Sequence, residues 1–438
     1  MPLRWGIAIL LTAVGVVLSQ QTPEASDPET ALERARGRLL TDLERLPRYT
    51  CVETITRRYY DPQSEGSCPA LMAAHEKRKS ESRLRGWDRL RLEVAIVDGD
   101  NVYSWVGAPR FESGTLEQLA GRGPLSSGDF GPFLHSIFSG ASVTFEGQQL
   151  AGKRRLLAYS YDMPVERSRY LVQTDNGWTA TAYRGVFVID PETTDIVSLT
   201  VSTTELPKSN PDCQAINEVQ YGRIQIHDRL VLVPRETRLV TIDRTGSETH
   251  STTEYASCRE YASTSRILFD ASPASLVTNA AAPPDSPPAT FPAGLHFRGR
   301  IITPIDSDTA AAGDPIEIVL RSPIRDKNNV ELAAAGTRLH GRLVGLEFHA
   351  GSLDYVRISI QFESIELKGK PVTLHAVPDS SQAIGISVFR APVSVSRDDI
   401  STSTTVLLFR KARLRLEKFD WGWTTLAAPL DGDNAGAH

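Results

Sequence analysis

The side chains that carry most enzyme chemistry are scattered in this sequence of 438 residues and match no familiar catalytic pattern. The nine histidines are spread from His75 to His438, and none forms an HExxH motif or lies at metal-ligand spacing beside carboxylates. There is no GxSxG serine motif, no P-loop and no dinucleotide-binding fingerprint. We therefore expect no catalytic residue, metal or cofactor, and a protein that is not an enzyme. A hydrolase with an unrecognised site is an alternative, because dispersed catalytic residues can hide in any sequence.

Two short patterns could be mistaken for metal ligands. Asp98-Gly99-Asp100 resembles a fragment of a calcium loop, but the remaining ligand spacing is missing, so a hairpin turn is favoured. His340 and His375 lie in strand-like segments, where a hydrogen-bonded structural histidine is the commoner case.

The four cysteines, Cys51, Cys68, Cys213 and Cys258, are even in number and contain no CxxC pair. Their spacing and the lack of nearby histidines oppose a zinc site, so two disulfides are expected. Four cysteines allow three pairings. We expect the most local one, Cys51–Cys68 with Cys213–Cys258, because it closes two modest loops within plausible hairpins.

The densest basic run contains Arg83, Arg85, Arg89 and Arg91, which alternate with leucines. In a strand this alternation places several cations on one face. A solvated sheet face is the simpler interpretation. A docking patch for anionic lipid head groups or an acidic partner is the alternative.

Apolar and aromatic residues suggest a cavity beneath a short helical lid. Phenylalanines at helical spacing predict a lid over residues 129–138, ended by Gly140. The candidate cavity residues are Val102, Trp105, Phe130, Phe133 and Phe138. The same side chains could instead pack the space solid as an ordinary core.

Composition and the first residues bear on the compartment. The chain is 40% hydrophobic and 23% charged, as in soluble proteins, and its net charge of −5 argues against nucleic acid as a partner. Residues 1–19 read as a signal peptide, with Arg4 before an apolar run shorter than the roughly 20 residues of a membrane span. We expect a periplasmic or secreted protein with no transmembrane span in its mature chain.

The rest of the chain predicts a mostly β protein. A helix is expected over residues 27–46, followed by many strands with short turns, such as the hairpin around Asp98-Gly99. The Ala- and Pro-rich residues 271–293 predict a linker. We thus expect a large curved antiparallel sheet, or half-barrel, with a few helices over residues 27–270. A small β-barrel or sandwich should follow over residues 294–424, with a disordered tail at 425–438.

Residues 90–206 resemble the lipoprotein-carrier and sigma-regulator fold of LolA, LppX and RseB. The residues that carry the resemblance are the hairpin around Asp98-Gly99, the stretch from Tyr183 to Thr194, and Leu199. The resemblance implies a curved half-barrel whose concave face, under a helical lid, holds a lipid or acyl chain.

Two further resemblances cover other parts of the chain. Residues 299–376 resemble the barrel of TrbI-like conjugation-channel proteins through Ala312-Gly313-Asp314 and the stretch from Gly336 to Arg342, but the long membrane-crossing helical insertion is missing. The mature chain resembles two-domain secreted proteins of Acidobacteria-type bacteria at residues 46–53, 128–131 and 258–261. Neither resemblance implies an activity here.

These features predict an exported, non-catalytic envelope protein. It would bind an apolar or lipid-like ligand, or act as a periplasmic chaperone or sensor. A structural component that docks onto an envelope protein partner without a ligand is the alternative. The oligomeric state stays open.

Overall fold

The computed structural model describes residues 27–62, 65–77, 82–97, 100–108, 119, 121, 123–124, 132–175, 177–204, 206–261, 291–378, 404–410 and 412–426. The predicted signal peptide, most of the predicted linker, Phe130 and nearly all of the predicted tail lie outside these residues. Of the helices in the described ranges, none has the length and apolar character needed to cross a membrane.

Antiparallel strands dominate the N-terminal part. Its main sheet has the order β4–β5–β8–β9–β10–β11–β12–β1–β2–β3, and a separate hairpin joins β6 to β7. The strands are β1 (Tyr49–Tyr60), β2 (Leu84–Val97), β3 (Asp100–Trp105), β4 (Ser142–Ala151), β5 (Arg154–Met163), β6 (Leu171–Thr174), β7 (Gly177–Ala180), β8 (Tyr183–Asp190), β9 (Asp195–Thr203), β10 (Asp212–Ile226), β11 (Arg229–Asp243) and β12 (Glu248–Glu260). The predicted hairpin is confirmed, since Val97 of β2 pairs with Asp100 of β3.

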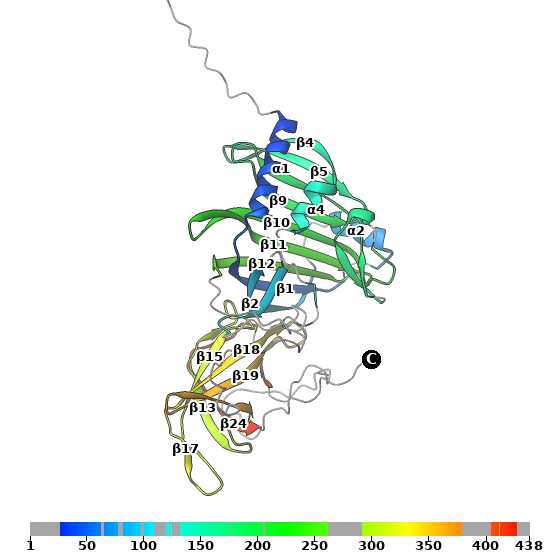
Figure 1. Ribbon diagram of the computed structural model, residues 1–438. Coiled ribbons are helices and arrows are strands. Elements are labelled where there is room, and N and C mark those ends of the chain that lie inside the picture. The colour runs from blue at the N-terminus through cyan, green and yellow to red at the C-terminus, as the bar shows by residue number, and fades with distance from the viewer. Residues whose placement is uncertain are drawn as a thin grey trace, which may run out of the picture.

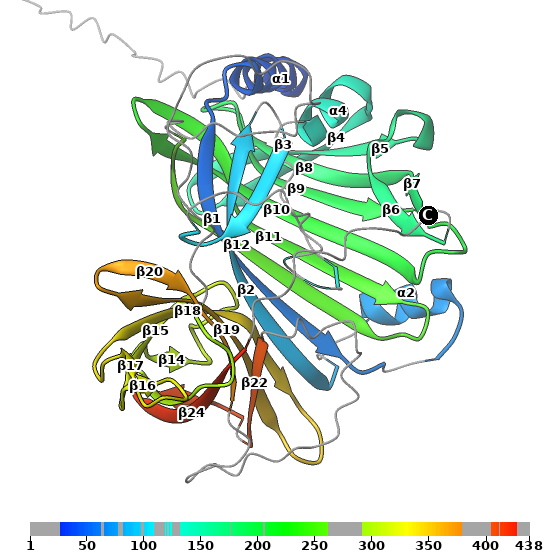
Figure 2. The ribbon, with the colours of Figure 1, turned by 60° about the horizontal axis from the view of Figure 1, so that its bottom comes forward.

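Helices cover one face of this sheet. They are α1 (Pro28–Glu44) and α4 (Pro132–Gly140), which lie side by side in Figures 1 and 2, while α2 (Cys68–Lys77) packs beside β10. A short 3-10 helix spans Val165–Arg167. The start of α1 follows the sequence closely: the Asp27 carboxylate accepts a hydrogen bond from the backbone N–H of Thr30, and Pro28 occupies the first turn.

The C-terminal part is a second set of antiparallel strands. Its pairings run β22–β19–β18–β15–β13–β24–β21, with β20 also on β19. The strands are β13 (His296–Ile301), β14 (Ile305–Asp306), β15 (Pro315–Leu320), β16 (Ile324–Arg325), β17 (Glu331–Ala333), β18 (Arg338–His349), β19 (Tyr355–Leu367), β20 (Lys370–Thr373), β21 (His375–Pro378), β22 (Thr404–Phe409), β23 (Arg415–Leu416) and β24 (Phe419–Leu426). Among the described strands these pairings do not close into a ring, so the part is a curved sheet around one hydrophobic cluster.

The two parts join through direct strand pairing. Trp87 of β2 pairs with Phe348 of β18, so one continuous sheet of 18 strands runs through both parts. Three hydrophobic clusters stabilise it: one in the C-terminal part, one beneath α1 and α4, and one around β1, β2 and β3. The mostly β, antiparallel fold class predicted from the sequence is therefore confirmed.

The disulfide pairing differs from the prediction. The bridges are Cys51–Cys258 and Cys68–Cys213, so the local pairing expected from the sequence is wrong. Cys51 lies in β1 and Cys258 in its neighbour β12, because the sheet brings the first strand of the N-terminal part beside its last one. Cys68 does not lie in a hairpin but opens α2, which packs on β10 where Cys213 lies. The predicted pairing assumed bridges between elements close in sequence, whereas the sheet pairs elements far apart in it.

Candidate functional site

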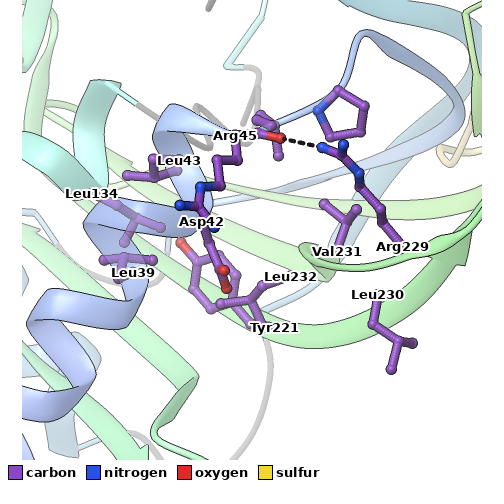
Figure 3. Close-up of a pocket in the computed structure, with 12 residues that line it drawn as sticks. Leu39, Asp42, Leu43, Arg45, Leu134, Tyr221, Arg229, Leu230, Val231 and Leu232 are labelled. Atoms are coloured by element: carbon purple, nitrogen blue, oxygen red, sulfur yellow. Dashed lines mark hydrogen bonds between the residues drawn. The ribbon is translucent and has the colours of Figure 1, made fainter.

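A pocket of about 740 Å³ lies between the end of α1 and the paired strands β10 and β11. Helix α1 contributes leucines at helical spacing, and the sheet contributes the aromatic ring of Tyr221. The twelve lining residues, drawn in Figure 3, are Leu39, Asp42, Leu43, Arg45, Leu46, Pro47, Leu134, Tyr221, Arg229, Leu230, Val231 and Leu232. Six leucines, a valine and a proline line the pocket together with Asp42, Arg45, Arg229 and Tyr221, so its surface is apolar and polar in about equal parts.

The position of α1 over the sheet follows from its two faces. Ala31, Ala35 and Leu39 are buried against the cluster beneath the helix, which is the spacing of one helical stripe. Arg36 donates from Nε to the backbone oxygen of Phe138 at 2.7 Å, which ties α1 to the end of α4. The last turn of α1 therefore stands over β10 and β11 at a fixed place.

A half-buried ion-pair network stabilises one wall of the pocket. The Arg223 guanidinium on β10 lies 2.6 Å from the Asp42 carboxylate of α1 and 2.7 Å from that of Asp195 on β9. It also donates to the backbone oxygen of Leu230 at 3.0 Å. The hydrogen bond to Asp195, together with that to Asp42 and against the opposing effect of burial, raises the pKa of Arg223 above its usual range. One side chain thus connects the helix, the neighbouring strand and the start of β11.

The floor of the pocket is half-buried at Tyr221, and its mouth is open. Burial raises the pKa of the Tyr221 hydroxyl above its usual range, as expected for a phenol with little access to water. By contrast, Leu230 is 62% exposed, and Arg45 and Arg229 are exposed at the mouth. Arg229 donates from Nη1 to the backbone oxygen of Arg45 at 3.4 Å, the dashed line in Figure 3. This arrangement can hold an apolar group inside and a polar one at the edge.

The cavity residues predicted from the sequence lie elsewhere. Val102 and Trp105 are on β3, and Trp105 packs near Gly313 at the joint with the C-terminal part. Phe138 on α4 is 1% exposed and contacts the ring of Phe187, with 5.0 Å between centroids, so it is a core residue beneath the helix. Phe130 and the side chain of Phe133 lie outside the described residues. None of the five is among the residues that line the pocket, although the predicted lid segment contributes Leu134 to it.

Two arginines of the predicted docking patch are engaged within the chain. Arg89 donates to the backbone oxygens of Ser307 at 3.0 Å and Ala310 at 3.3 Å, and Arg91 forms an ion pair with Asp314. All three partners belong to the C-terminal part, so these cations join the two parts of the molecule. Arg83 and Arg85 are exposed, and a docking role for them stays a prediction.

Pocket residues could be found only in part from the sequence. The helical spacing of Leu39 and Leu43 indicates an apolar face on the first helix, but the same signal describes a helix packed solid. Leu230 and Leu232 alternate in a strand, yet only the placement of that strand under α1 makes them a wall. No group of metal-ligating side chains gathers anywhere in the described ranges.

No family model and no curated protein matches this chain. Among the solved structures that do match, two cover 55% of it, each with 11% sequence identity and a TM-score of 0.27. One is a DUF1329 family protein from Desulfovibrio piger, 96% covered, and the other is an outer membrane lipoprotein-sorting protein domain from Vibrio parahaemolyticus, 95% covered. At this TM-score the matches carry no argument about function. The resemblances of the C-terminal part to TrbI-like barrels and of the chain to acidobacterial-type proteins stay predictions.

Proposed function

We propose that this protein is an exported, non-catalytic envelope protein that binds an apolar or lipid-like ligand in the pocket between α1, β10 and β11. The observation that carries this proposal is a hollow beside which Leu43 of α1 and Leu230 and Leu232 of β11 are left half-buried or exposed. Leu39 and Leu134 are buried at its inner end, while Leu230 is 62% exposed at its mouth. A contiguous apolar concavity open to water is typical of ligand sites.

The size of the pocket agrees with a small-molecule ligand. Its volume of about 740 Å³ lies within the roughly 300–1,000 Å³ of ligand pockets in proteins. The Arg223 network fixes α1 to β9 and β10 beside this space, which supports a preformed site. A preformed site of this kind costs little reorganisation on binding.

The two disulfides favour the exported location. All four cysteines are bridged, and no free cysteine remains among the described residues. Such bridges persist in oxidising compartments such as the periplasm or the extracellular space. A carrier or sensor of lipid-like molecules in the envelope would work in that environment.

Native mass spectrometry of protein purified gently from its own envelope tests the proposal. We expect a lipid-sized mass that stays with the protein and is lost on mild delipidation. The variant Leu232→Glu, which places a charge in the wall, should carry less of this mass than Leu353→Glu, which changes an exposed leucine of the C-terminal part. A bare protein mass in every preparation would contradict the proposal.

A second function, docking onto another envelope component without a ligand, is favoured by the hairpin β6–β7. Leu171 and Trp178 lie diagonally on one face of it, and they are 54% and 60% exposed. Exposed aromatic and aliphatic pairs of this kind are enriched in protein interfaces. If Leu171→Ser with Trp178→Ser abolishes a complex seen in the same native spectra while the pocket stays empty, this second function replaces the first.

A further inference from the structure

The charged side chains around the pocket mouth carry more positive than negative charge. This excess indicates which class of ligand the pocket can bind. The ionisable lining residues are Asp42, Arg45 and Arg229, besides the phenol of Tyr221. Asp42 is already matched, because Arg223 and Arg38 together face the carboxylates of Asp42 and Asp195, two positive charges against two negative ones. Its negative charge is therefore not available to neutralise the two arginines at the mouth.

Neither Arg45 nor Arg229 has a strong acidic partner among the described residues. Arg229 lies 3.9 Å from the Asp228 carboxylate, but both side chains are more than 60% exposed, and such a pair is weak in water, so Arg229 can still bind another anion. No ion pair of Arg45 within the described residues is found. The two cations nevertheless meet at one place, since Arg229 donates to the backbone oxygen of Arg45 (Figure 3).

The end of α1 offsets this positive charge only in part. A helix C-terminus carries the equivalent of about half a negative charge, against one full positive charge on each of two guanidinium groups. The mouth thus keeps an excess of positive charge beside an apolar interior. Guanidinium groups bind carboxylate and phosphate oxygens with paired hydrogen bonds, which neutral head groups cannot match.

We propose that the ligand is an anionic amphiphile, whose carboxylate or phosphate head binds Arg45 and Arg229 while its single apolar chain lies among Leu39, Leu43 and Leu232. This inference rests on the proposed function, since it names the ligand class of the same pocket. It also gives the orientation of the ligand: the apolar chain lies inside the pocket, and the head group stays at the mouth in water.

Displacement of a dansyl-labelled fatty acid from the purified, delipidated protein tests the inference. The competitors share one dodecyl chain and differ in the head: dodecanoic acid, dodecyl phosphate, dodecanol and dodecylamine. We expect both anions to bind at least about tenfold more tightly than the alcohol, the effect of one or two charge-assisted contacts at a partly exposed rim. The amine should bind most weakly. The tighter of the two anions identifies the source of the head group.

The double variant Arg45→Gln with Arg229→Gln should bring the acid down to the affinity of the alcohol and leave the alcohol unchanged. Arg34→Gln, an exposed arginine on the outer side of α1, is the matched control and should change neither. An equal melting temperature of both variants shows that they are folded. Equal binding of acid and alcohol by the natural protein overturns the inference and leaves the proposed function intact. If no dodecyl compound binds, the proposed function fails and the inference fails with it.

Discussion

Glu53 is the most unusual single residue of the sheet. It lies in β1 between Leu92 of β2 and Tyr255 of β12, is 1% exposed, and its Oε2 has no hydrogen-bond partner in the part of the chain that the structure describes. Burial raises its pKa to about 8, so the carboxyl group is protonated at neutral pH. The alternation of β1 places Glu53 on the inward face with Cys51 and Ile55. The sequence does not show whether a cation lies beside its carboxyl group.

The buried carboxyl group makes folding stability depend on pH. Its folded pKa of about 8 is above the ordinary value of 4.5, so between these two pH values the folded state keeps a proton that the unfolded state has lost. The free energy of unfolding should therefore fall as pH rises from 4.5 to 8, by roughly 1 kcal/mol per pH unit, and this contribution should be constant above pH 8. Glu53→Gln should remove this fall, as measured by urea denaturation at several pH values.

Glu254→Gln is the matched control for Glu53→Gln, because Glu254 lies on the adjacent strand β12 with an exposed side chain. This variant should keep the pH dependence of the natural protein. A Glu53→Gln protein with the same fall in stability would show that the Glu53 carboxyl group is ionised in the folded state.

At the scale of elements, the sequence predicts those helices and strands whose formation depends on local residue patterns. The helix over 27–46 and the hairpin around Asp98-Gly99 appear as α1 and as the paired strands β2 and β3, because capping and alternation are local signals. The sequence does not predict helix α2. This short helix over residues 68–77 is attached to β10 mainly by a disulfide and a small cluster around Leu71. Both are contacts between residues far apart in the chain, which local periodicity does not show. Likewise, the pocket depends on where α1 crosses the sheet, which periodicity cannot predict.

The Cys68–Cys213 bridge should be the main attachment of α2. It closes a separation of 145 residues, so removing it should lower the free energy of unfolding by about 3 kcal/mol and leave α2 loosely held. Cys68→Ser with Cys213→Ser should show this loss in denaturant, with faster hydrogen exchange in residues 68–77. Hydrogen exchange elsewhere in the sheet is the internal control.

Peptide mapping without reduction checks the pairing itself. It should recover Cys51 linked to Cys258 and Cys68 linked to Cys213. Peptides with the local pairing, or with free thiols, would contradict the arrangement of β1 beside β12 and of α2 beside β10.

The whole molecule is a sheet that continues across two parts of the chain. The Ala- and Pro-rich residues 271–293 predict a linker between two domains, and this division stays a prediction. What composition could not show is the joint: β2 pairs with β18, and Arg342 of β18 donates to the backbone oxygens of Val106 and Gly313, each at 2.7 Å. The strand pairing and the bond to Val106 join residues more than 200 positions apart, so only the folded chain reveals them, whereas Gly313 belongs to the same part of the chain as Arg342.

Gly313 is the tightest point of this joint. It has a φ of +105°, and a Cβ there would lie 2.0 Å from the backbone oxygen of Arg91. Gly313→Ala should therefore lower the free energy of unfolding by about 3 kcal/mol. Gly351→Ala, where a Cβ meets nothing within 4 Å, should change it by less than about 0.5 kcal/mol. Equal stability of the two variants would mean that the parts do not meet at Gly313.

Filling the pocket is the most direct test of the claim that the protein binds an apolar chain between α1, β10 and β11. The affinity for a dansyl-labelled fatty acid should be measured for Leu43→Trp, which places a large ring in the pocket, and for Leu353→Trp, which places the same ring on an exposed surface. The account predicts at least about tenfold weaker binding by Leu43→Trp and unchanged binding by Leu353→Trp, with both variants folded. Equal affinity of the two variants would contradict it, because the ligand would then bind elsewhere or not at all.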